Sequence, residues 1–390
     1  MSDVVSTAFV GARRRLFGLA LKTGIATILT LGFYRFWAKT RLRRWYWSSI
    51  RPGGHPLEYT GDGVEKITGF LIAVVILAFW LAIVNLLVMF ASLSIFAAPQ
   101  SAYAISILLL VPLWFWARYR ARAYTLSRTR WRGIRFGMAP GALGYAMRAC
   151  LHWVLTIASL GLLWPRMTFR LEKYRTDRTY FGTARFEQGG RALMLYRAFA
   201  PAYVAALLCV GAGIVGAAAD PRAFWLLLPL VPLFLAAALR YRVRSIGIMA
   251  SEKRLDGLKL AARPSPAGIG RIVAYGGLAI LILLLLPVLG LALAQLLLLP
   301  EEVLSNPFDL FSLGPMAWLA AGLFVVIYFG VFLMWGVLRH ALITAPMLRH
   351  YAESLTLEGV GALEAVAQRP GAAARGAEGF AEALDLGAAI

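Results

Sequence analysis

The stretch TLGFYRFWAKTRLRRWYWSSIRPGGHPLEYTG, residues 30–61, decides the architecture because its pattern occurs a second time in the chain. The second copy is SLGLLWPRMTFRLEKYRTDRTYFGTARFEQGG, residues 159–190, at a constant offset of 129 residues. Each copy contains the end of an apolar helix, then a basic aromatic helix, then a short strand closed by glycines. The pattern therefore predicts a duplicated structural unit. The identical aligned pairs are Leu31/Leu160, Gly32/Gly161, Arg41/Arg170, Leu42/Leu171, Gly53/Gly182, Glu58/Glu187 and Gly61/Gly190.

Composition places the chain among integral membrane proteins. Hydrophobic residues make up 60% of the sequence, charged residues only 15%, and the mean hydropathy is +0.70. Soluble globular proteins have about a quarter of their residues charged. The net charge of +21 comes from lysines and arginines between the apolar segments. No loop is long enough to form a soluble basic domain, which argues against nucleic-acid binding.

Six apolar segments have about the length that a bilayer core requires, roughly 20 residues. We expect them to pair as three hairpins, because short connections join them two by two. Two of them, 101–117 and 223–239, are short and contain prolines. The six predicted spans are 67–90, 101–117, 199–219, 223–239, 272–299 and 316–338.

The charge of the connecting loops predicts their orientation. Basic residues concentrate in 39–66, 118–138, 166–197 and 240–271, whereas the hairpin tips have almost none. Basic loops stay on the cytoplasmic side, so both termini are predicted to be cytoplasmic. The two cysteines lie within apolar segments and indicate no disulfide framework.

Two further apolar stretches, 16–37 and 142–164, are flanked by basic residues at both ends. A single crossing would place one basic flank outside. We therefore interpret both as interfacial or re-entrant helices on the cytoplasmic side. The alternative, eight ordinary spans, stays open.

The expected fold is an all-α membrane protein. It would be a polytopic helical bundle of about six transmembrane helices with two interfacial or re-entrant helices, short cytoplasmic β strands and an internal repeat. Alternation in LEYT, WRGIRF and DGLKL indicates the strands. The expected division is a first repeat (1–138), a second repeat (139–264), a third hairpin (265–345) and a cytoplasmic tail (346–390).

The first copy, with its basic aromatic helix and its LEYTG strand, resembles the YjgN-type bacterial inner-membrane proteins, a family of unknown function. The EGFAEALDLG-like tail adds to the resemblance, which covers essentially the whole chain. The second copy departs from it, with LLWPRM where the first has YRFWAK. The resemblance implies a location in the bacterial inner membrane and a multipass architecture. It implies no activity and no catalytic residues.

The sequence contains no pattern typical of an enzyme. The histidines lack the spacing of metal ligands, and no cofactor or metal site is predicted. Glu58 and Glu187 are equivalent carboxylates of the two copies, for which we weigh a salt bridge to the basic helix against a ligand or partner site. No predicted span contains an ionisable residue, although ion-coupled carriers place such residues inside the membrane. A transporter or channel for a small solute remains the alternative function.

The basic aromatic helices are the candidate binding surface. Clusters of lysine and arginine beside a span contact anionic phospholipid headgroups, at about 1 kcal/mol for each residue near the surface. The alternative is that these charges only set the topology. No partner other than membrane lipid is predicted. The candidate headgroup residues are Arg41, Arg43, Arg44, Trp45, Arg170, Lys173 and Tyr174.

Overall fold

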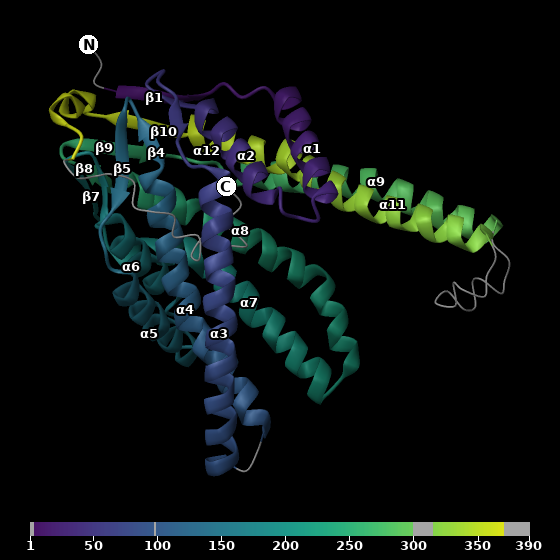
Figure 1. Cartoon of the computed structure of the whole chain (residues 1–390). Helices are drawn as coiled ribbons and strands as arrows, with labels where there is room; N and C mark the ends of the chain where they lie inside the picture. Colours follow the sequence, from purple (N-terminus) through teal and green to yellow (C-terminus); the bar gives the residue numbers. More distant parts are fainter. Residues whose placement is uncertain (1–3, 97–98, 299–314, 370–390) are drawn as a thin grey trace. The chain divides into compact units, whose positions relative to one another are not determined.

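The computed structural model of the chain describes residues 4–96, 99–298 and 315–369 (Figure 1). The chain divides into two compact units. The sheet unit comprises residues 1–10, 47–270 and 350–390, and the helical unit comprises residues 11–46 and 271–349. Neither unit is therefore a continuous stretch of sequence.

Ten short antiparallel strands of the described residues form one sheet in the sheet unit (Figure 1). Their order is β2-β1-β10-β9-β8-β7-β6-β5-β4-β3. The two ends of this order, β2 and β3, follow each other in the chain and are in contact. The sheet consequently curls into a nearly closed barrel. The strands are β1 (Val4–Phe9), β2 (Ile50–Pro52), β3 (Leu57–Tyr59), β4 (Thr129–Trp131), β5 (Ile134–Met138), β6 (Thr179–Phe181), β7 (Ala184–Gln188), β8 (Lys253–Leu255), β9 (Leu258–Ala262) and β10 (Leu355–Glu358).

Strand β1 joins the two ends of the chain within this sheet. Its first half pairs with β10, from Val4↔Glu358 to Ser6↔Thr356. Its second half pairs with β2, from Thr7↔Pro52 to Phe9↔Ile50. Without β1 the sheet would end at β10 and β2 would lose its described partner strand.

An apolar core covers one side of the sheet. Its buried side chains come from strands far apart in the sequence and from the short 3-10 helix η4 (Val360–Ala365). Alternate residues of a strand point to the same face, which is why β4, β6 and β8, of three residues each, contribute one core side chain each. The core residues are Trp131, Phe181, Ala184, Leu255, Leu258, Leu357 and Leu363.

Helical hairpins depart from the sheet and return to it. The chain leaves β3 into α3 and α4 and re-enters at β4, and it leaves β7 into α7 and α8 and re-enters at β8. The neighbouring helices α5 and α6 lie between β5 and β6 in the chain. The bounds are α3 (Gly63–Phe96), α4 (Pro99–Ser127), α5 (Ala142–Ala158), α6 (Trp164–Thr176), the 3-10 helix η1 (Ala192–Leu195), α7 (Tyr196–Ala218), the 3-10 helix η2 (Pro221–Leu226) and α8 (Leu227–Ser251).

The helical unit contains α1, most of α2 and the last long helices. Helix α1 packs on α11, with Gly24 against Leu333. In the same unit, the Tyr46 hydroxyl lies 3.1 Å from Nδ1 of His340. The bounds are α1 (Arg13–Leu29), α2 (Arg35–Ser49), α9 (Pro266–Leu298), α11 (Pro315–Leu338), the π-helix η3 (Arg339–Thr344) and α12 (Ala345–Glu353), where α2, α9 and α12 extend into both units.

The turns α1–α2 and α5–α6 have the same backbone hydrogen bonds at the offset of 129 residues. Leu31 and Leu160 both adopt positive φ, 50° and 51°, and each is followed by a glycine with positive φ. The amide of Gly32 donates to Thr27 O at 2.7 Å, and that of Gly161 donates to Thr156 O at 2.8 Å. The hydroxyls of Thr30 and Ser159 accept from the amides of Tyr34 and Leu163.

Among the described residues, five helical segments are long and apolar enough to cross a membrane. They are Gly63–Ala91, Ala192–Ala218, Pro221–Ser251, Pro266–Gly290 and Gly322–Glu353. The predicted span 101–117 lies within α4 and is not one of the five. The predicted tip 300–315 lies almost wholly outside the described residues, as does the tail beyond residue 369.

The prediction of an all-α bundle of six spans is therefore wrong. The chain is mostly helical, but the ten-stranded sheet organises the sheet unit. Strands of three to six residues give too little alternation to be weighed against long apolar helices. The pairing of β1 with β10, between the two ends of the described chain, leaves no local signal.

We expect Gly182→Ala to destabilise the protein more than Gly133→Ala. Both glycines occupy hairpin turns at positive φ, 54° and 80°. A Cβ on Gly182 would overlap the carbonyl oxygen of Ala367 and lie 2.8 Å from Ile134, whereas a Cβ on Gly133 would meet nothing within 4 Å. Backbone strain should cost about 1 kcal/mol at Gly133, and strain with overlap about 2–4 kcal/mol at Gly182. Chemical unfolding in neutral detergent measures both, and equal costs would contradict the packing of residue 367 on this turn.

Candidate functional site

A buried carboxylate on α6 joins three elements of the sheet unit. Oε2 of Glu172 lies 2.7 Å from Nη2 of Arg175 on the same helix. Oε1 of Glu172 lies 2.7 Å from Nζ of Lys253 on β8, and Arg122 of α4 lies 3.5 Å from Oε2. One negative charge thus holds α4, α6 and β8 together.

The electrostatics of this cluster keep Glu172 ionised. Burial alone would raise the pKa of the Glu172 carboxyl, but Arg175, Arg122 and Lys253 outweigh it and hold the pKa well below its ordinary value. Burial would likewise lower the pKa of Arg175, which the Glu172 carboxylate raises instead. The cluster carries more positive than negative charge and stabilises the fold without a group ready to exchange a proton near neutral pH.

Aromatic side chains of α6 and α4 contact α5 and the residues just before it. The ring of Tyr174 lies 3.7 Å from the guanidinium carbon of Arg178 and 4.7 Å from that of Arg148. The Tyr174 hydroxyl donates to Gly141 O at 3.0 Å. Tyr119 donates to Ala139 O at 2.6 Å, and burial raises its pKa to about 12. Tyr174 is therefore a buried packing residue, although the sequence suggested a headgroup contact.

On α2, the basic helix of the first copy, only some of the predicted headgroup residues are exposed at the surface. Arg41 is exposed, with its guanidinium 5.6 Å from the centre of the Tyr34 ring. Arg44 is also exposed, but Arg43 is only 4% exposed. Trp45 is half-buried and packs edge-on against Tyr46. Arg41 and Arg44 are thus the predicted headgroup residues of this helix that lie on the surface.

The predicted headgroup residues of the second copy also differ from one another in exposure and contacts. Arg170 is exposed, at the position of Arg41. Lys173 donates to Gln188 O at 2.7 Å and lies 3.1 Å from a carboxylate oxygen of Asp177. Lys173 therefore fastens α6 to β7, a role that its sequence equivalence to Arg44 did not predict.

Glu58 and Glu187 are both exposed on strands. Glu58 stands opposite Arg130 on the neighbouring strand, and Glu187 stands opposite Arg254. In the described part of the chain, neither Glu58 nor Glu187 forms an ion pair. The structure brings neither one to the Glu172 cluster.

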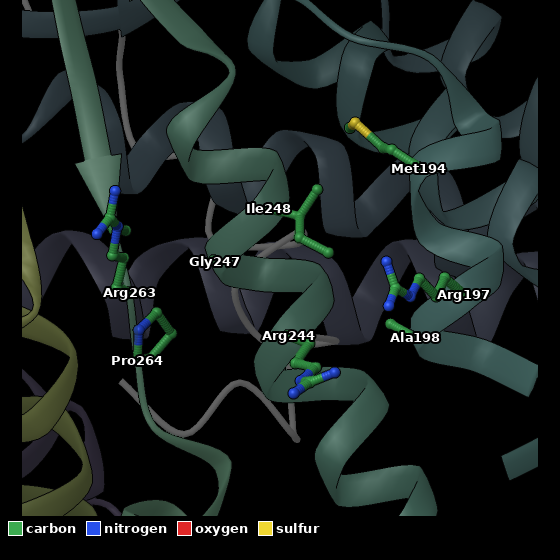
Figure 2. Close-up of a pocket in the computed structure, with 9 residues that line it drawn as sticks. Met194, Arg197, Ala198, Arg244, Gly247, Ile248, Arg263 and Pro264 are labelled. Atoms are coloured by element: carbon green, nitrogen blue, oxygen red, sulfur yellow. The ribbon is translucent and has the colours of Figure 1, made fainter. Parts of the chain in front are cut away.

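A cavity of about 310 Å³ opens in the sheet unit beside the start of α7, the end of α8 and the chain after β9 (Figure 2). We call it the arginine pocket, because three exposed arginines from three elements line it. Sequence reasoning missed it, since these arginines are spread over three loops and helix ends. The lining residues are Met194, Arg197, Ala198, Arg244, Gly247, Ile248, Ala262, Arg263 and Pro264.

Within the described residues, no group of three or more histidine, cysteine, aspartate or glutamate side chains is placed to hold a metal ion. The free cysteines Cys150 and Cys209 are half-buried. The arginine pocket thus offers cationic and apolar side chains.

The model of a family described as bacterial proteins of unknown function, DUF898, matches residues 5–383. The chain belongs to this family. It is the YjgN-type family that the first copy resembles. No curated protein and no solved structure matches the chain.

Replacing Glu172 by glutamine should cost about 3 kcal/mol of unfolding free energy, because it leaves three cations without their shared carboxylate. Glu187→Gln, an exposed carboxylate, is the control and should cost under about 0.5 kcal/mol. Because the folded-state pKa of Glu172 is depressed, its contribution is complete above its ordinary value of 4.5 and is lost as the pH falls below that value. Chemical unfolding between pH 7 and pH 3.5 checks this. A difference between wild type and Glu172→Gln that stays constant throughout would contradict it.

Proposed function

We propose that this DUF898 member is a multipass protein of the bacterial inner membrane, not an enzyme, whose basic cytoplasmic face contacts anionic lipid headgroups. The observation that carries this proposal is a repeated surface: a nearly fully exposed leucine at a helix–turn–helix tip, followed on the next helix by exposed arginine.

Apolar outer surfaces support the membrane location. Many of the exposed residues along α7 and α8 are large and apolar, for example Val204 (55% exposed), Ile214 (62%) and Leu235 (59%). Contiguous apolar surface of this extent is unfavourable in water and favourable in lipid. Five helical segments with this character support several crossings.

The sheet supports the predicted location of the termini. The amino-terminal strand β1 is hydrogen-bonded to β10, which follows the last described long helix. Both ends of the described chain therefore lie at one sheet, on one side of a membrane. The loops near that sheet are the basic ones, which the positive-inside rule assigns to the cytoplasm.

The turn tips combine strain with exposure. Leu31 is 91% exposed and Leu160 is 81% exposed, although both are held at positive φ. That conformation costs a residue with a Cβ about 1–2 kcal/mol. Exposed apolar neighbours, Leu29 and Phe33 in one copy and Leu162 in the other, enlarge each tip. A hydrocarbon environment would make this exposure favourable.

Exposed arginines follow each tip on the basic helix. Arg41 and Arg170 occupy equivalent positions, and Arg166 is exposed one turn before Arg170. Apolar side chains inserted into a bilayer with arginines at headgroup level give both hydrophobic and electrostatic attraction to anionic lipid.

We expect the double variant Arg41→Gln, Arg170→Gln to retain less anionic lipid. Each arginine near the headgroups should contribute about 1 kcal/mol, so phosphatidylglycerol affinity should fall about fivefold at each copy. Phosphatidylcholine should be retained as before, because it carries no net charge. Native mass spectrometry of the purified chain with defined lipid mixtures measures both.

The matched control is Arg132→Gln, Arg254→Gln, which removes the same charge from exposed positions on the sheet. It should retain phosphatidylglycerol like wild type. If the two double variants lose anionic lipid equally, the basic helices have no specific role and only the net charge matters.

A further inference from the structure

We infer that the arginine pocket of the sheet unit is a binding site for a phosphate group. The site is separate from Arg41 and Arg170, so either proposal can fail without the other. Three arginines, several apolar residues and the start of α7 line it.

Three different elements supply the cations. Arg197 lies in the first turn of α7, Arg244 lies in the last two turns of α8, and Arg263 directly follows β9. Figure 2 shows Arg197 extending from its helix toward the helix of Gly247, Arg244 on that same helix, and Arg263 on the strand side of Gly247. Guanidinium groups from several directions match the several oxygens of a phosphate.

No described carboxylate neutralises these arginines. Within the described residues, no ion pair includes Arg197, Arg244 or Arg263. No acidic residue lines the pocket. Glu252, which directly follows α8, lies against Gly189 and Gly190 and does not line the pocket. The positive end of the α7 helix dipole adds further positive potential beside Arg197.

The equivalent place in the first copy contains its own anion. At the offset of 129 residues, Met194 corresponds to Glu65, close to the start of the matching helix α3. Glu65 pairs with Arg128 at 2.9 Å and accepts a hydrogen bond from Tyr124 at 3.1 Å. The first copy thus supplies a carboxylate where the second copy has a methionine and a cavity. Counted from the following strand, Glu252 stands at the place of Arg128, so the second copy contains neither member of this ion pair.

The apolar wall indicates how two sources of phosphate would differ. Ala198, Ile248 and Pro264 line the pocket, and the exposed apolar surface of α7 continues below it from Val204 onward. A phospholipid could place its phosphate among the arginines and its chains along α7. Inorganic phosphate or a soluble phosphate ester would use the arginines alone.

The test uses the full chain in neutral detergent and two probes, inorganic phosphate and dihexanoylphosphatidylglycerol, at constant ionic strength. Isothermal titration calorimetry should detect binding of at least one probe by wild type. Arg244→Gln should weaken it about tenfold, since one charge-assisted hydrogen-bonding group is lost. The triple variant Arg197→Gln, Arg244→Gln, Arg263→Gln should bind at least about a hundredfold more weakly.

The matched control is Arg191→Gln, Arg240→Gln, Arg254→Gln, which removes three exposed arginines of the same unit outside the pocket. It should bind both probes like wild type. Tighter binding of the lipid than of phosphate identifies a headgroup as the source, and equal binding identifies a soluble phosphate. Absence of binding by wild type, equal affinities of wild type and the pocket triple, or equal losses in the two triples would overturn the proposal. The single variant Arg244→Gln keeps the test valid if the triple does not fold.

Discussion

The fold depends on the hydrogen bonds of strands that are too short to exist alone. Strands of three to six residues satisfy their backbone groups only when each has neighbours, and an isolated hairpin of this size is marginal in water. The chain meets this requirement by collecting ten of them into one nearly closed sheet. Because β1 bridges β2 and β10, the first described residues are as necessary to that sheet as the strand that follows the last helices.

This requirement also constrains the apolar helices. Strand β3 pairs with β4, and β7 pairs with β8, although a long helical hairpin separates each pair in the chain. Each helical hairpin must therefore end beside the sheet, where it began. The sheet and the loop charges are independent sources of the same restriction, because backbone pairing does not depend on lysine or arginine.

The sequence could predict what is local. The Leu-Gly turns, the basic helices and the short strands within LEYT, WRGIRF and DGLKL are visible from neighbouring residues. The sheet order was not predictable, since the first half of β1 pairs with Thr356, Leu357 and Glu358 at the other end of the described chain. Glu172 was missed for another reason: the aligned residue of the first copy is Arg43, so a search for shared residues passes over it. The sequence indicates headgroup contacts for Lys173 and Tyr174, because the hydrogen-bond partners of these two side chains, Gln188 and Gly141, are distant in sequence.

The differences between the two copies bear on function more directly than their similarities. The turns share backbone geometry, but the charges are reversed at several equivalent places. Arg43 corresponds to Glu172, and Arg128, counted from the following strand, corresponds to Glu252. A duplicated scaffold whose charges had only a structural role could keep one arrangement in both places. The first copy contains the ion pair between Glu65 and Arg128. The second copy contains the Glu172 carboxylate among three cations and, separately, the arginines around the pocket. A phosphate ligand of the arginine pocket should therefore bind once per chain, at the second copy, whereas the lipid contacts proposed for Arg41 and Arg170 occur at both copies.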